Sequence, residues 1–192
     1  MVVVRDPSLY RDERIVEDYP ENFIGRGAIG AVLTTDVLSC YFRDLAGVGA
    51  RGILDTRGQP SASAALASFA EFLKLSIAFQ LDVSPDEFRV GRQPLTVDEV
   101  RTEQVFIADA LENGAGYARQ ASDPKNFRDW LRHHYERETQ RWTDPSHSRD
   151  CDRSCPDCLR NYGNRFSHGL LDWRLALDLA GLALGEPIPL QR

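Results

Sequence analysis

The chain has 192 residues, 42% of them hydrophobic, which is enough for one domain with a buried core. Lysine and arginine number 23 against 29 for aspartate and glutamate, and the net charge of −6 argues against a free-standing, non-specific nucleic-acid binder, which needs a basic surface. No stretch approaches the roughly 20 continuous apolar residues that span a bilayer, and the N-terminus lacks the pattern of a signal peptide, so we expect a cytoplasmic protein without a membrane partner.

The first part of the chain predicts little regular structure. Residues 1–27 are dense in charge and show no hydrophobic period, which is typical of an irregular N-terminal arm. Residues 30–42 are rich in β-branched and aromatic side chains, which favours a strand. Residues 44–60 contain four glycines, so we expect a loop there, with a short element at 52–55.

A long helix and two strands are predicted next. The helix runs from Ser61 or Ser63, either of which can cap it, to about residue 80, because apolar side chains recur there at helical spacing. Its apolar surface is broad, so we expect it to be buried against a sheet or to lie under a partner. Segments 87–90 and 103–109 are predicted strands, and the second is apolar on both faces, which favours a central position.

Gly114 and Gly116 follow the second of these strands, at a place where backbone amides can cradle an anion. The third glycine of a dinucleotide-binding fingerprint and the lysine of a P-loop are both missing, and no P-loop motif occurs anywhere in the chain, so we expect no ATP hydrolysis. We therefore interpret the two glycines as positions that need a positive φ or close packing.

Two more helices are predicted, at 124–142 and at 170–184, followed by a C-terminal tail at 185–192. His133 and His134 are neighbours in the first of them and cannot both point at one site. We interpret both histidines as polar or partner-facing residues.

Three of the four cysteines and one of the four histidines fall in the stretch His147-Ser-Arg-Asp-Cys151-Asp-Arg-Ser-Cys155-Pro-Asp-Cys158. Zinc prefers four sulfur or nitrogen ligands in a tetrahedron, and a Cys-x2-Cys turn supplies two thiolates at once. A thioredoxin-like redox pair has the same spacing, but it lies between a strand and a helix and needs no third cysteine. The sequence therefore predicts a zinc site rather than a redox pair or unligated cysteines.

Three residues compete for the fourth coordination position. His147 is ranked first because it closes the site within one loop, at little entropic cost. His168 lies ten residues after Cys158, close enough for a short helix to bring it back. Cys40 is ranked last, because its predicted strand places it among apolar neighbours, where a buried free thiol is the simpler interpretation.

These elements predict an α+β fold. We expect a small mixed β-sheet packed with about three helices, and a zinc-binding loop between the last two helices.

Further sequence blocks accompany the cysteines in a fixed order: Thr35-Asp36-Val37-Leu38, then Asp109 to Gly114-Ala-Gly116-Tyr117, then Cys151-x3-Cys155-Pro-Asp-Cys158-Leu-Arg-Asn-Tyr162-x-Asn164-x3-His168-x2-Leu171-Asp172-Trp173. Over residues 28–184 the chain resembles the MrfA-type zinc-binding domain, which occurs at the C-terminus of superfamily 2 DNA helicases and in the DISARM anti-phage component DrmB.

The resemblance implies a single domain with a four-cysteine zinc site that packs beside a helicase motor. Cys151, Cys155 and Cys158 match the last three ligands of that family, whereas Arg149 stands where the first cysteine would fall and cannot bind zinc. Because Arg149 cannot supply the fourth ligand, His147 becomes the first candidate for that position.

Three other residues, Asn164, His168 and Asp172, also match the family pattern. For them we expect only a supporting role, in capping helices and bracing the zinc loop.

The favoured hypothesis is a non-catalytic zinc-binding module that associates with a superfamily 2 helicase or a defence-complex subunit, in DNA repair or anti-phage defence, and meets DNA through that partner. The alternative is a zinc hydrolase acting on nucleic acid, with His147 unbound, water in its place and Asp109, Asp150, Asp152 or His168 as base. A third hypothesis is a metal or redox sensor whose cysteines release zinc on oxidation.

Overall fold

The computed structural model describes residues 34–43 and 52–187. The elements described below lie in one compact unit that runs from residue 35 to residue 192. The arm predicted for 1–27, the start of the strand predicted at 30–42 and most of the tail predicted at 185–192 lie outside the described residues.

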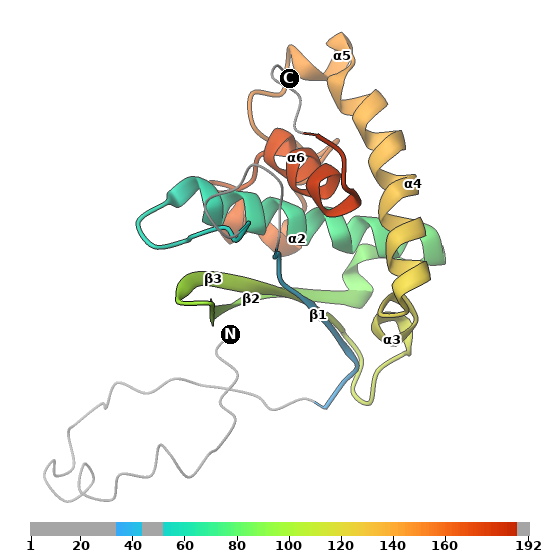
Figure 1. The fold of residues 1–192 in the computed structure, drawn as a ribbon. Coiled ribbons are helices and arrows are strands. Elements are labelled where there is room, and N and C mark those ends of the chain that lie inside the picture. The colour runs from blue at the N-terminus through green and yellow to red at the C-terminus, as the bar shows by residue number, and fades with distance from the viewer. Residues whose placement is uncertain (1–33, 44–51, 188–192) are drawn as a thin grey trace, which may run out of the picture. The chain divides into compact units, whose positions relative to one another are not determined.

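A three-stranded sheet has the order β1–β3–β2, with β1 at Val37–Cys40, β2 at Phe88–Val97 and β3 at Val100–Asp109 (Figure 1). The α+β class and the central position of β3 are confirmed. Both strand pairs are antiparallel, where a mixed sheet was expected. A two-residue hairpin turn at Asp98 and Glu99 makes the β2–β3 pair antiparallel, and its φ angles of 48° and 68° are of the kind that glycine or asparagine usually supplies.

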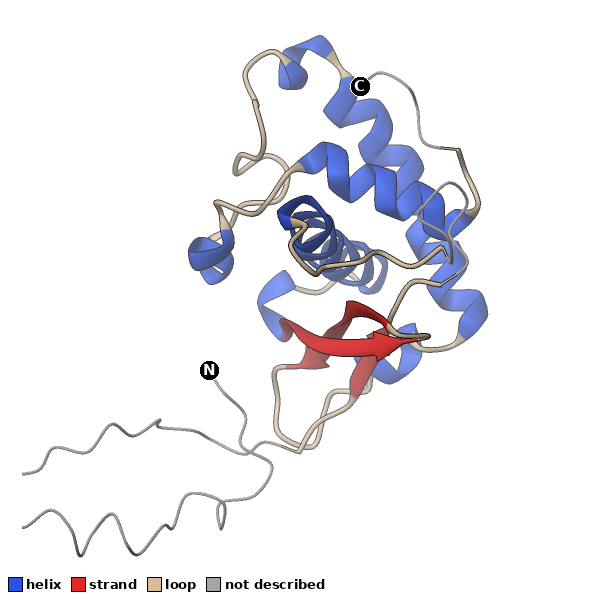
Figure 2. Cartoon of the chain, turned by 60° about the vertical axis from the view of Figure 1, so that its left-hand side comes forward, coloured by secondary structure: helices blue, strands red, loops and turns tan. Residues whose placement is uncertain are grey.

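Helix α2 (Pro60–Leu81) lies between the sheet and the other long helices, where it packs against β2, β3, α4 (Pro124–Thr143) and α6 (Trp173–Leu184). The three long helices lie on the same side of the sheet (Figure 2). Of the two positions expected for the apolar helix, it therefore takes the one against the sheet. It is also long and apolar enough to cross a membrane, but 83% of its most apolar window is buried inside the protein, as in a core helix.

The helix start differs from the prediction. Pro60 occupies the first turn and Gln59 is the N-cap residue, without a capping side chain. Ser63 instead accepts a hydrogen bond of 2.7 Å from the Arg92 guanidinium, which also pairs with Glu103 at 2.7 Å. Ser63 thus ties α2 to the hairpin, and the cap predicted at Ser61 or Ser63 was wrong.

The remaining elements are short. They are η2 (Pro85–Glu87), α3 (Tyr117–Ala121), α5 (Pro145–Ser148) and η3 (Tyr162–Ser167). The loop before α2 is irregular from 52 to 56, so the short element expected at 52–55 is absent from this part of the structure.

The glycine turn after β3 surrounds the buried carboxylate of Asp109. Its two oxygens accept hydrogen bonds of 2.8, 3.1 and 2.8 Å from the backbone N–H groups of Ala115, Tyr117 and Ala118. Gly114 and Gly116 have φ angles of 74° and 82°, which confirms the positive φ expected for them. The amide cradle is therefore occupied by an anion of the chain itself.

One expectation about α4 needs correction. His133 is exposed, but His134 is only 3% exposed and lies against the Phe72 ring of α2, with centroids 4.7 Å apart. Successive residues of a helix point about 100° apart, so one histidine faces solvent and its neighbour faces the core. The interpretation of His134 as partner-facing was wrong.

Candidate metal centre

The predicted zinc residues lie between α4 and α6, in the loop that begins with α5. The Sγ atoms of Cys151, Cys155 and Cys158 and a ring nitrogen of His147 all lie within 4.8 Å of one another. Asp144 caps α5 by accepting a hydrogen bond from the Ser146 N–H, and the carbonyl of His147 accepts from the Cys151 N–H at 2.9 Å. The short helix therefore holds the histidine and the first cysteine side by side.

The distances between these atoms fit a tetrahedral zinc site. Bonds of about 2.3 Å to sulfur and about 2.0 Å to nitrogen place two sulfurs about 3.8 Å apart, and a sulfur and a nitrogen about 3.5 Å apart. The Sγ atoms of Cys151 and Cys158 are 3.8 Å apart, and Cys155 Sγ lies 3.5 Å from His147 Nε2. Two of the six distances thus match a tetrahedral zinc site, and all six are within 4.8 Å, so the residues present fit this ion.

The imidazole of His147 is fixed by the helix before it. Its Nδ1 lies 2.9 Å from the carbonyl oxygen of Trp142, in the last turn of α4. A hydrogen bond donated from Nδ1 leaves the lone pair on Nε2, the nitrogen that faces the cysteines. The ring also lies between Trp142 and Trp173, at centroid distances of 6.4 and 5.6 Å.

The thiols of Cys151 and Cys158 are buried, so their thiolate forms need a bound cation to balance the charge. Cys151 is 3% exposed and Cys158 is 8% exposed. Burial raises the pKa of both thiols, and the neighbouring Cys158 sulfur raises the pKa of Cys151 further. A divalent metal ion compensates the buried thiolate charge, so we expect zinc to displace protons from these sulfurs when it binds.

Side chains from both flanking helices hold the loop through its backbone. Arg141 of α4 donates to the carbonyl of Asp157, and Arg174 of α6 donates to that of Asp152. Trp173 donates twice, from Nε1 to the Cys151 carbonyl at 3.2 Å and from its backbone N–H to a loop carbonyl at 2.8 Å. The loop is therefore positioned by hydrogen bonds, with its metal ligands facing inward.

The other candidates for the fourth position lie outside this group. His168 Nε2 lies 2.9 Å from Asn164 Oδ1 and 3.1 Å from the Asn161 carbonyl. Cys40 is on β1, opposite Val105, and burial raises the pKa of its thiol to about 12. The structure thus brings His147, and neither alternative, to the three cysteines. The four-residue ligand set itself stays a prediction.

Three residues that match the family pattern have structural contacts. Asn164 and Asn161 form a reciprocal capping box at the start of η3, and Asn164 Nδ2 donates to the Leu159 carbonyl at 2.8 Å. Asp172 caps α6 by accepting from the Arg174 N–H at 2.9 Å. These contacts agree with the supporting role expected for them.

Two supporting residues were not predicted from the sequence, namely Trp142 and Trp173. Both are 1% exposed and contact the His147 ring, and one of them supplies the carbonyl that orients it. A backbone carbonyl carries no residue-type signal, so no motif could have indicated it. Trp173 belongs to the last block that matches the family, but a matching position does not indicate which groups the side chain contacts.

If His147 and the three cysteines all bind zinc, no position is left for a water molecule and the ion can only stabilise the fold. Two of the four bases considered for a hydrolase are already engaged in hydrogen bonds. Asp109 is 0% exposed and holds three backbone N–H groups, while His168 is hydrogen-bonded to Asn164. Asp150 and Asp152 are exposed on the loop. This arrangement favours a closed structural site.

Comparisons with known proteins agree with the site. Residues 69–159 match the family model of the MrfA Zn-binding domain, a segment that contains all four predicted ligands and ends directly after Cys158. Zinc as the cofactor is confirmed at the level of this family.

One relative and one solved structure are each much longer than the segment of this chain that matches them. The Druantia protein DruE of Escherichia coli (strain UMEA 4076-1) is 34% identical over 129 residues, which cover 65% of this chain and 6% of that protein. The crystal structure of the DUF1998 helicase MrfA bound to DNA matches with a TM-score of 0.47 and 17% identity, over 69% of this chain and 16% of that chain. The chain thus spans a small part of each protein. The resemblance predicted from the sequence is confirmed over residues 69–159, which match the model of the MrfA Zn-binding domain.

Proposed function

We propose that this chain is a non-catalytic zinc module that works with a superfamily 2 helicase, in the same polypeptide or as a separate subunit, and that it aids assembly or DNA engagement. The observation that carries the proposal is a group of three sulfurs and one nitrogen within 4.8 Å of one another, in which one sulfur–sulfur distance of 3.8 Å and one sulfur–nitrogen distance of 3.5 Å match a zinc tetrahedron. The match to the MrfA zinc-binding domain supports the link to a helicase. Three thiolate ligands suit a reducing compartment, so a cytoplasmic location belongs to the same proposal.

X-ray absorption at the zinc edge of the purified, zinc-loaded chain tests the closed site. We expect three sulfur and one nitrogen scatterers, with no oxygen. In the His147→Ala variant an oxygen should replace the nitrogen, because removing the imidazole opens one position to water. An oxygen scatterer in the unmodified protein would instead favour the alternative of a zinc hydrolase with an open site.

The link to a helicase is tested by looking for ATPase activity that co-purifies with the chain. The chain contains no P-loop motif, so such activity would come from a partner. The tagged chain, expressed at its natural level and purified, should carry a DNA-stimulated ATPase with it. The Cys155→Ser variant should lose this activity, whereas Cys40→Ser should keep it, because Cys40 lies outside the metal group. A purified protein without ATPase would contradict the helicase partnership, and the genes beside this one would show whether repair or anti-phage defence is the setting.

A further inference from the structure

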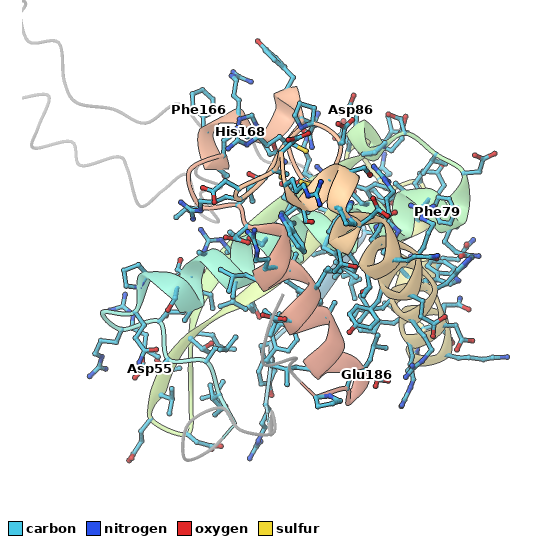
Figure 3. The ribbon with its side chains drawn as sticks, turned by 90° about the horizontal axis from the view of Figure 1, so that it is seen from above. Asp55, Phe79, Asp86, Phe166, His168 and Glu186 are labelled. Carbon is cyan, nitrogen blue, oxygen red and sulfur yellow. The ribbon has the colours of Figure 1, made fainter. Side chains whose placement is uncertain are left out.

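Segment η3 presents two large aromatic side chains to solvent. Tyr162 is 81% exposed and Phe166 is 88% exposed, the highest values among the exposed large hydrophobic residues of the described part of the chain. The Arg165 guanidinium lies over both rings, 4.4 Å from the centroid of Tyr162 and 4.3 Å from that of Phe166. Figure 3 shows Phe166 at the outer edge of this segment, near His168.

This exposure is built into the fold. The Asn161–Asn164 capping box fixes the start of η3, and Asn164 Nδ2 bonds the carbonyl of Leu159, which is 1% exposed and directly follows the metal-site residue Cys158. Arg165 Nη1 also donates to the Tyr162 carbonyl at 3.2 Å. The rings are therefore held out from a braced turn beside the zinc site, which lowers the entropy lost when they bind a partner.

The local charge indicates what kind of partner fits. Residues 159–171 include Arg160, Arg165 and His168 but no aspartate or glutamate, in a chain whose net charge is −6. An exposed aromatic surface with unopposed arginines suits an anionic partner that also offers flat rings.

A second arginine–aromatic pair provides a contrast. Arg137 lies 3.5 Å over the ring of Phe79, which is 46% exposed. That guanidinium is already paired with the buried carboxylate of Glu138. Asp82 also lies nearby, because it lines the same surface pocket as Phe79 and Arg137. The two arginine–aromatic groups are chemically similar, but only the group in η3 lies in a segment, residues 159–171, that contains no acidic residue.

We propose that Tyr162, Arg165 and Phe166 form a binding surface for single-stranded DNA, whose unpaired bases stack on the two rings while Arg165 faces the phosphate backbone. This inference rests on the proposed function, because it names the surface through which a zinc module of a helicase engages DNA. The zinc site then has a definite task, which is to hold this surface in place.

Fluorescence anisotropy with a labelled oligothymidylate of about 15 nucleotides tests the surface on the isolated, zinc-loaded chain. Replacing Tyr162 or Phe166 by alanine should weaken binding about tenfold or more for each ring. Tyr162→Phe should retain affinity because it keeps the ring. Phe79→Ala, the matched control, should also retain it, because that ring lies on a different side of the protein (Figure 3). Zinc content measured in each variant should equal that of the parent.

Three outcomes would overturn the proposal. Unchanged affinity in both alanine variants would exclude these rings, and equal affinity for an abasic oligonucleotide of the same length would exclude stacking. Tighter binding of oligouridylate would assign the surface to RNA instead. The anisotropy assay needs no partner, so it tests the DNA-binding surface alone. The proposed function is tested separately, because its failure would appear as the absence of the co-purifying ATPase. If the alanine variants bind DNA normally but lose that ATPase, η3 is a protein-docking surface and this proposal is wrong.

Discussion

The α2 core and the zinc loop are neighbours held together by different forces. In the core, Phe69, Phe72 and Ile77 of α2 are at most 1% exposed, and the helix packs against β2, β3 and α6. The loop between α4 and α6 contains neither a strand nor a long helix. Leu159 and Leu171 join the core, and the rest of the loop is held by hydrogen bonds to its backbone carbonyls and by the four candidate metal ligands. Apolar burial stabilises the first region, whereas the second depends on an ion.

The two regions share a boundary at two tryptophans. Trp142 contacts the Phe72 ring of the core at 5.6 Å and orients His147 through its carbonyl, while Trp173 begins α6 and bonds the carbonyl of Cys151. The core thus positions the metal site, but the metal is not needed for the contacts within the core. Loss of zinc should therefore affect the loop first, and damage to the core should affect the whole domain.

Zinc removal is expected to have the largest effect. Structural zinc contributes about 10–16 kcal/mol in small zinc-finger peptides, and the loop here has no strand or long helix of its own to replace it. Chelation should abolish hydrogen-exchange protection from residue 144 to 172 and leave α2 and β3 protected. Hydrogen exchange with mass spectrometry measures both regions at once.

The matched variants for this experiment are Cys155→Ser and Cys40→Ser. The first removes a metal-group sulfur and should reproduce the effect of the chelator. The second removes a thiol on β1 and should leave zinc content unchanged. Global unfolding on chelation would show that the core also depends on the ion, which would remove the distinction between the two regions.

Phe69→Ala is expected to have the next largest effect, in the α2 core rather than in the zinc loop. Phe69 is 0% exposed and contacts Phe42 edge-to-face at 4.8 Å. Truncation of a buried phenylalanine costs about 3–5 kcal/mol in the free energy of unfolding, which denaturant titration measures. Zinc affinity of the folded variant should stay close to that of the parent. Phe79→Ala, at a half-exposed position, should cost less than about 1 kcal/mol, and an equal loss in both variants would contradict the burial argument.

Asp109→Asn should weaken the turn after β3 by about 2–3 kcal/mol. The carboxylate accepts three backbone N–H groups, whereas an asparagine side chain offers one oxygen and turns its NH2 group toward a donor. Asp123→Asn is the matched control, because Asp123 caps α4 at an exposed position where asparagine serves as well. A comparable loss of thermal stability in both variants would show that burial of Asp109 is unimportant.

The long elements were predictable from the sequence because burial imposes a period on them. The helices predicted at 124–142 and 170–184 appear as Pro124–Thr143 and Trp173–Leu184, and the strand predicted at 103–109 is central. The hairpin was missed because its turn, Asp98-Glu99, lacks the glycine that usually follows aspartate or asparagine in a two-residue hairpin.

The zinc cluster was predictable because its residues are close in sequence and have the chemistry of ligands. The parts that escaped prediction act through backbone atoms or through packing between distant segments. The Trp142 carbonyl that orients His147 is one such part, and the Asp109 carboxylate in the glycine turn is another. Residue type alone indicates neither contact, because each depends on where the fold brings the chain.

The most gradual expected effect is a dependence of stability on pH, and it concerns the buried His134 of α4. Burial, and then the charges of Arg137, Arg141 and His133, lowers the pKa of His134 to about 3. An unfolded histidine titrates near pH 6.5, so below that pH the unfolded state binds one proton more than the folded state. Stability should therefore fall as the pH decreases from 6.5 toward 3, by at most about 1.4 kcal/mol for each pH unit.

The His134→Gln variant isolates this contribution. It should be less stable than the parent at pH 7, because the contact with the Phe72 ring is lost, but its stability should depend less on pH between 6.5 and 5. Zinc release on acidification is common to both proteins, so the difference between their slopes, measured by urea unfolding, reports the histidine alone. His133→Gln, at the exposed neighbour, should leave the slope of the parent unchanged. Equal slopes for all three proteins would mean that His134 is solvated, and that the core does not extend to the zinc loop in solution as the structure places it.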